Sequence, residues 1–113
     1  MIQVTFTEKG NRLSLTLKGH AGYAEVGKDI VCASASILAY TVAQFVMEAE
    51  NNGDIASSAE ISLDSGDTVI SCEPTEDAMS SIQSVYSFAK MGYALLAHNY
   101  PHCVQFNEFG QAE

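Results

Sequence analysis

The residues best suited to chemistry in this sequence are a histidine and a cysteine, His20 and Cys32, which are twelve positions apart in the chain. Asp29 precedes an amphipathic run and predicts a helix N-cap, so Cys32 falls in the first turn of a helix. There the sulfur meets unpaired backbone N–H groups and the positive end of the helix dipole, and both stabilise a thiolate. The thiolate is the nucleophilic form, and a nearby imidazolium favours it further. The spacing is therefore compatible with a Cys–His pair for nucleophilic catalysis.

Three glycines accompany this pair in the sequence: Gly19 directly precedes His20, and Gly22 and Gly27 lie between His20 and Cys32. Glycine accepts positive φ and allows close approach of a substrate, so we expect a loop that folds back and brings His20 within hydrogen-bond reach of Cys32. Ser36 lies one turn after Cys32 on the same helical face and is a candidate donor beside the thiolate. Asp29 has two open interpretations: a helix cap alone, or a group that also orients His20.

Other interpretations of the cysteines stay open. Free cysteine is often a small buried apolar residue, which is the simpler interpretation of Cys32 and above all of Cys72, since Cys72 alternates with Ile70 in a predicted strand. Cys103 follows His102 directly, which is a poor geometry for a nucleophile and its base. Zinc could use the same residue types, but no pair has a compact ligand spacing, and no nucleotide-binding glycine motif is present. We predict no metal and no other cofactor.

The 113 residues include 14 acidic and 5 basic side chains, for a net charge of −9. This acidity disfavours direct binding of nucleic acid, whose phosphates attract Lys and Arg, and favours a basic protein partner. No uninterrupted apolar run reaches the ~18 residues of a membrane span, and the first residues lack the pattern of a signal peptide. We expect a single domain over residues 1–113 that is cytoplasmic, does not bind a membrane and keeps its thiols reduced.

Apolar periodicity predicts the elements that must position the candidate site. Alternation predicts strands at 2–7, 13–18, 59–63, 69–70 and 103–109. Helical spacing predicts one helix from Asp29 to about residue 50, and a second that opens at Thr75, a candidate cap, and has Phe88 on its inner face. The order ββ-α-ββ-α-β predicts an α+β fold with two layers, in which two helices cover a mostly antiparallel sheet.

A specific pattern extends over residues 19–36, and it consists of Gly19-His20-Ala21, Gly27, Asp29-Ile30-Val31-Cys32-Ala33 and Ser36. In order and spacing this pattern resembles the signature of the ribosomal-processing cysteine protease Prp family, and the length and element order of the whole chain are similar too. The resemblance implies a bacterial cysteine protease that forms a homodimer, with His20 and Cys32 as its catalytic residues. The chain departs from the pattern at Ala35, where a larger aliphatic residue is common, and this affects the packing of the pocket.

The resemblance also implies a substrate and a mechanism. The substrate would be the N-terminal extension of the large-subunit ribosomal protein number twenty-seven, cut after a phenylalanine. Cys32 would attack the scissile carbonyl, and His20 would protonate the leaving amine and then activate water. Backbone N–H groups at the helix start are the expected oxyanion donors, and the glycine loop is expected to close over the substrate. Alternatives are a non-catalytic ribosome-associated assembly or binding factor and a thiol-based redox sensor.

Overall fold

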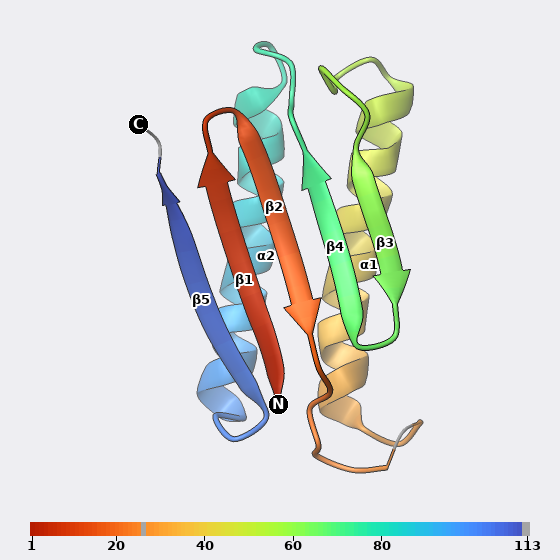
Figure 1. Ribbon diagram of the computed structural model, residues 1–113, viewed down its shortest axis with the longest axis vertical. Helices are drawn as coiled ribbons and strands as arrows, with labels where there is room; N and C mark the ends of the chain where they lie inside the picture. The colour runs from red at the N-terminus through yellow and green to blue at the C-terminus, as the bar shows by residue number, and fades with distance from the viewer. Residues whose placement is uncertain (26, 112–113) are drawn as a thin grey trace.

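Two hairpins and two helices follow one another along the chain, and a fifth strand comes after them (Figure 1). The computed structural model describes residues 1–25 and 27–111. The elements are β1 (Ile2–Lys9), β2 (Arg12–Lys18), α1 (Ile30–Asn51), β3 (Glu60–Asp64), β4 (Asp67–Cys72), α2 (Met79–Asn99) and β5 (Val104–Gln111). The predicted order of elements and the predicted α+β class are confirmed.

The five strands form one sheet in the order β3-β4-β2-β1-β5. All neighbouring pairs are antiparallel except β1 and β5, which run parallel with Ile2 opposite Val104. The second hairpin therefore lies beside the first, because β4 pairs with β2 from Leu13–Cys72 to Lys18–Asp67. This pairing brings the turn between β3 and β4 next to the end of β2, where the candidate histidine begins its loop.

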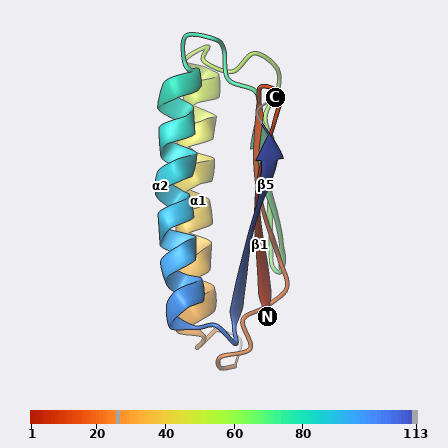
Figure 2. The same cartoon turned by 90° about the vertical axis from the view of Figure 1, so that its left-hand side faces the viewer.

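Both helices cover the same face of the sheet, and the other face is open (Figure 2). Apolar residues that alternate along the strands, such as Val4, Leu15 and Ile70, are fully buried in the core. The two helices run in opposite directions (Figure 1) and contact each other closely, since a Cβ atom at Gly92 would lie 2.9 Å from Leu38 Cδ1. Together these contacts form one hydrophobic core between the sheet and the helices.

Helix α1 is long and apolar enough to cross a membrane by length and composition. In the folded chain, however, its buried residues recur with helical spacing on one face. They are Val31, Ala35, Ala39, Val42, Ala43, Val46 and Ala49. A helix with one apolar face against a sheet is typical of a domain core, and we interpret α1 in this way.

Two details of the predicted second helix are wrong. The helix begins at Met79 with Ala78 as its N-cap residue and without a side-chain cap, whereas Thr75 Oγ1 accepts the N–H of Ala78 at 3.3 Å in the preceding turn. Phe88 is 75% exposed. The inner face is set by Ala89 and its helical neighbours, and Phe88 lies about 100° around the axis from Ala89.

Candidate active site

Asp29 joins the start of α1 to the loop that precedes it. Its Oδ1 accepts the N–H groups of Val31 and Cys32, both at 2.9 Å, and so caps the helix. Its Oδ2 accepts the N–H groups of Tyr23 at 2.9 Å and Ala24 at 3.1 Å, and so holds the loop. The helix start and the loop are therefore one hydrogen-bonded unit with a single buried carboxylate at its centre.

These four hydrogen bonds also determine the charge of Asp29. Burial raises the pKa of Asp29, but the backbone N–H groups of Cys32, Ala24, Tyr23 and Val31 lower it more, so the pKa lies below its usual value of 3.8. The side chain is thus an anion at neutral pH. Within the described residues, none of its hydrogen bonds goes to His20. Asp29 is therefore a helix cap, which was one of the two interpretations of the sequence. It also binds the loop, which the sequence did not predict.

The loop folds back over Cys32. Cys32 lies in the first turn of α1, as predicted, and is half-buried. The N–H of Ala21 donates to its Sγ at 3.3 Å, and Ala21 itself is 3% exposed. The return of the chain requires glycine, because the three loop glycines, at positions 19, 22 and 27, have φ values of +93°, +71° and +90°. The expected glycine loop is therefore present, with a backbone amide against the sulfur.

The sequence predicted that the N–H groups at the start of α1 are the oxyanion donors, but in the structure these groups are already hydrogen-bonded. The N–H groups of Val31 and Cys32 donate to the Asp29 side chain, and the N–H of Ala33 donates to the Asp29 carbonyl at 3.0 Å. A side-chain cap satisfies the same donors that an oxyanion would need. The backbone donor beside the sulfur is instead the loop amide of Ala21.

The imidazole of His20 lies against Gly66, in the turn between β3 and β4. A Cβ atom at Gly66 would lie 2.7 Å from His20 Nε2 and 3.1 Å from Cε1. The N–H of Gly19 donates to the Gly66 carbonyl at 2.9 Å. Both residues of the predicted pair lie in the described part of the chain, and no hydrogen bond joins them there. Such bonds are often long before a substrate is bound.

A single cavity of about 570 Å³ brings the predicted site residues together. Its lining includes Gly19, His20, Gly22, Gly27, Asp29, Cys32 and Ser36. Its volume is in the range of about 300–1,000 Å³ that is usual for ligand sites. The sequence did not reveal its second wall, which the β3–β4 hairpin supplies through Leu63, Gly66 and Thr68. The glycine turn was visible in the sequence, but its position beside His20 depends on the β2–β4 pairing.

The other two cysteines lie elsewhere. Cys72 is buried, with its Sγ 3.7 Å from Tyr86 Oη, and burial raises the pKa of this thiol. Cys103 is half-buried and precedes β5. Neither lines the cavity that contains Cys32. Within residues 1–25 and 27–111, no three His, Cys, Asp or Glu side chains come close enough together to hold a metal ion.

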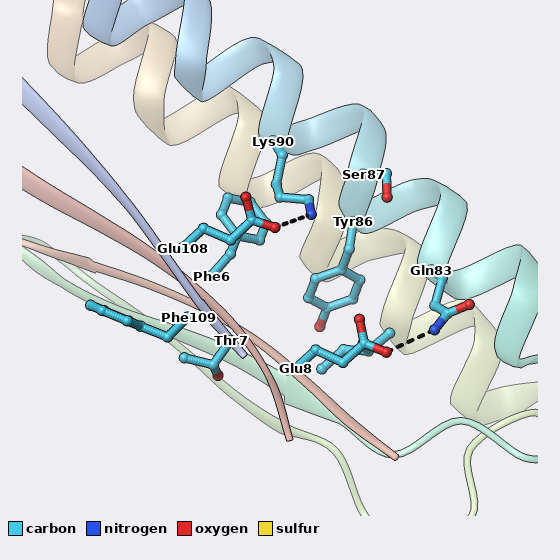
Figure 3. Close-up of a pocket in the computed structure, with 10 residues that line it drawn as sticks. Phe6, Thr7, Glu8, Gln83, Tyr86, Ser87, Lys90, Glu108 and Phe109 are labelled. Atoms are coloured by element: carbon cyan, nitrogen blue, oxygen red, sulfur yellow. Dashed lines mark hydrogen bonds and ion pairs between the residues drawn. The ribbon is translucent and has the colours of Figure 1, made fainter. Parts of the chain in front are cut away.

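A second cavity, of about 530 Å³, opens between α2 and the C-terminal halves of β1 and β5. Figure 3 shows two side-chain pairs that span it: Lys90 contacts Glu108 at 2.6 Å, and Gln83 donates to Glu8 at 2.9 Å. All ten lining residues belong to the described part of the chain, and none is a cysteine or a histidine. Four of its polar side chains thus form two pairs, and the candidate nucleophile and base, Cys32 and His20, line the first cavity.

The sequence profile described as cysteine protease Prp matches residues 1–105. The chain belongs to the Prp family of cysteine proteases. This confirms the resemblance seen in the sequence, and it identifies the chain as a hydrolase that uses a cysteine. No curated protein sequence matches the chain.

Solved structures share the fold of this chain. The crystal structure of SMU.848 from Streptococcus mutans is 30% identical, covers 98% of this chain and 96% of its own, and has a TM-score of 0.68. An essential ribosomal processing protease Prp from S. aureus with a covalently linked product peptide is 22% identical, with coverages of 96% and 99% and a TM-score of 0.73. The same protease with a substrate peptide is 20% identical, with the same coverages and a TM-score of 0.66.

Proposed function

We propose that this Prp protease is an endopeptidase in which Cys32 is the nucleophile and His20 is the general acid and base. One observation carries this proposal: of the three cysteines, Cys32 is the one that lines the cavity of about 570 Å³, and His20 lines the same cavity. The loop amide of Ala21 gives further support, because it donates to the sulfur at 3.3 Å and so holds the loop that carries His20 against Cys32.

The proposed reaction proceeds through a thioester. The Cys32 thiolate attacks the scissile carbonyl carbon, and the carbonyl electron pair moves to oxygen. The N–H of Ala21 donates to the sulfur before the attack. It can donate to this oxyanion once the sulfur has given up its charge to the new C–S bond, and one such donor contributes roughly 3–4 kcal/mol. His20 then protonates the leaving amine. It next takes a proton from water, which attacks the thioester and releases the acid product and the thiolate.

The imidazole of His20 rests on the hairpin wall of the cavity at Gly66, and no hydrogen bond joins it to Cys32 within the described residues, so the cavity must close for this reaction. The glycines at positions 19 and 22 flank His20 and provide the backbone freedom for such a movement. Substrate that fills the cavity between the hairpin and α1 would hold the imidazole over the scissile bond. Loop closure of this kind assembles many active sites only when substrate is present.

We propose as substrate the N-terminal extension of the large-subunit ribosomal protein number twenty-seven, cut after a phenylalanine in the cytoplasm. Support comes from the S. aureus Prp structures, which contain a substrate peptide or a product peptide. The cavity also has an apolar part, formed by Ala39, Tyr40 and Leu63, that can accept an aromatic side chain. The net charge of −9 attracts a basic ribosomal protein.

The experiment is cleavage of a synthetic peptide that copies the extension, followed by mass spectrometry. The wild type is expected to cut after the phenylalanine. Cys32→Ala should lose cleavage and stay folded, whereas the matched variant Cys103→Ala should keep both, since Cys103 is outside the cavity. Binding without cleavage by the wild type would favour the assembly factor, and alkylation of Cys32 without hydrolysis would favour the redox sensor.

We also propose that two copies form a homodimer through the helices. The most exposed apolar side chains of the helices are Ile37, Phe88, Met91 and Leu95, at 58% to 75% exposure. Tyr40 and Met47 on α1 are also exposed, at 50% and 38%. The helices contain only Glu48 and Glu50 of the 14 acidic residues. Two chains of net charge −9 can therefore meet there with few carboxylates opposed.

Light scattering on size-exclusion fractions tests the dimer. Phe88→Ser is expected to give a monomer, because Phe88 is the most exposed of these side chains at 75%. Phe109→Ser is the matched control, since Phe109 is 61% exposed but lies on the edge strand β5. A wild type that elutes as a monomer, or equal effects of the two substitutions, would contradict this interface.

A further inference from the structure

We propose that Gly66 is a positioning residue for His20: its bare backbone is the surface on which the imidazole rests, and this contact determines where the base stands relative to Cys32. The inference rests on the proposed catalytic role of His20. It concerns a residue outside the glycine loop, on the hairpin that forms the opposite wall of the cavity.

The backbone brings the two residues together. Strands β2 and β4 pair as far as Lys18 and Asp67, whose side chains also form an ion pair. The N–H of Gly19 then donates to the Gly66 carbonyl at 2.9 Å and extends the pairing by one step. Because Gly19 turns the chain at a φ of +93°, His20 leaves the sheet at this point. The side chain of His20 therefore lies against the β3–β4 turn.

The contact itself leaves no space for a side chain at position 66. The three heavy atoms nearest to a Cβ there all belong to the imidazole of His20, with Nε2 at 2.7 Å, Cε1 at 3.1 Å and Cδ2 at 3.4 Å. A Cβ atom does not approach a non-bonded nitrogen or carbon atom as closely as the first of these distances. A methyl group at Gly66 must therefore displace the ring. His20 is exposed and its ring ends a rotatable side chain, so the ring moves and the fold is retained.

A substitution at Gly66 has two effects that need to be separated. Its φ of +72° strains any L-residue, independently of His20. Gly53 has a φ of +83° and open space where a Cβ would be, so Gly53→Ala carries the backbone strain without the collision. Gly10→Ala, at a φ of +60° in the β1–β2 turn, is a second control of the same kind.

The kinetic test compares these variants on the extension peptide. Gly66→Ala is expected to lower kcat by about 10- to 100-fold, with KM changed by no more than about twofold, because a misplaced base slows the chemical step and not binding. Gly53→Ala and Gly10→Ala should leave both constants within about twofold of the wild type. In the His20→Ala background, Gly66→Ala should have no further effect on kcat, since the obstructing atoms are gone.

A structural readout separates failure of this inference from failure of the proposed function. In the wild type, NMR should detect a nuclear Overhauser effect between the ring protons of His20 and the α-protons of Gly66, which Gly53→Ala retains. The pH profile of Cys32 alkylation should shift in Gly66→Ala and not in Gly53→Ala. If the wild type cuts no peptide, these two results still decide the inference. A missing Overhauser effect, or equal effects of Gly66→Ala and Gly53→Ala, overturns it.

Discussion

Asp29 and Cys32 are linked twice, once through the backbone and once through the loop. The N–H of Cys32 donates to Asp29 Oδ1 at 2.9 Å. Oδ2 of the same carboxylate holds the loop whose Ala21 N–H lies 3.3 Å from Cys32 Sγ. One carboxylate therefore sets both the helix turn that carries the sulfur and the loop that covers it, and a change at Asp29 should affect stability and the site together.

Asp29→Ala is expected to lower the free energy of unfolding by about 2 kcal/mol, because it removes a helix cap and two hydrogen bonds to the loop. Cleavage should fall as well, since the loop over Cys32 loses its attachment. Urea denaturation measures the first effect and peptide cleavage the second. Asp77→Ala, at an exposed carboxylate, is the control. A loss of stability no larger than that of the control would contradict the role given to Asp29.

The pH dependence of stability has a definite sign at Asp29. Its pKa in the folded chain is lower than its usual value of 3.8, so the unfolded chain binds its proton first as the pH falls. The stabilisation is fully present above about pH 5 and is lost as the pH falls through the folded pKa. Urea midpoints of the wild type and Asp29→Asn should thus converge towards pH 2. A difference that stays constant over this range would refute the prediction.

The cysteines should differ in reactivity. Cys72 is fully buried and burial raises its pKa, so iodoacetamide should modify it only after unfolding. Cys32 should react in the folded protein, and His20→Ala should move its alkylation profile to higher pH if imidazolium and thiolate interact. Mass spectrometry of digests taken with time follows each site, and the urea-unfolded chain is the control. Rapid modification of Cys72 in the folded chain would contradict its burial.

The contact between Tyr23 and Tyr100 should hold the glycine loop against the end of α2. Their ring centroids are 5.6 Å apart and the rings are tilted by 81°, an edge-to-face pair worth about 0.5–1.5 kcal/mol. Tyr100→Ala should therefore speed amide exchange in residues 19–25 and lower kcat/KM by about two- to tenfold. Tyr100→Phe keeps the ring and should behave as the wild type. Exchange that is unchanged in Tyr100→Ala would show that this contact does not hold the loop.

Much of the local structure followed from the sequence because its causes lie within a few residues. Alternation along β1 and β2 predicted the first hairpin, and Asp29 predicted the cap of α1 and the place of Cys32 in its first turn. The glycines predicted the loop, since positive φ is a property of single residues. Their combination with His20 and Cys32 was also specific enough to indicate the family, which the profile match confirmed.

Tertiary structure decided the relationships between distant residues. Gly66 contacts His20 because β4 pairs with β2 in the sheet. This pairing is determined by the burial of the apolar faces of both strands in the core, and no local sequence pattern specifies it. In the same way, Phe88 lies outside because the packed face of α2 is set by its neighbours on the sheet. The backbone N–H that donates to the sulfur is that of Ala21, whereas the N–H of Cys32 at the helix start donates to the Asp29 carboxylate. Each of these three features depends on contacts between residues that are distant in the sequence, and such residues become neighbours only when the chain folds.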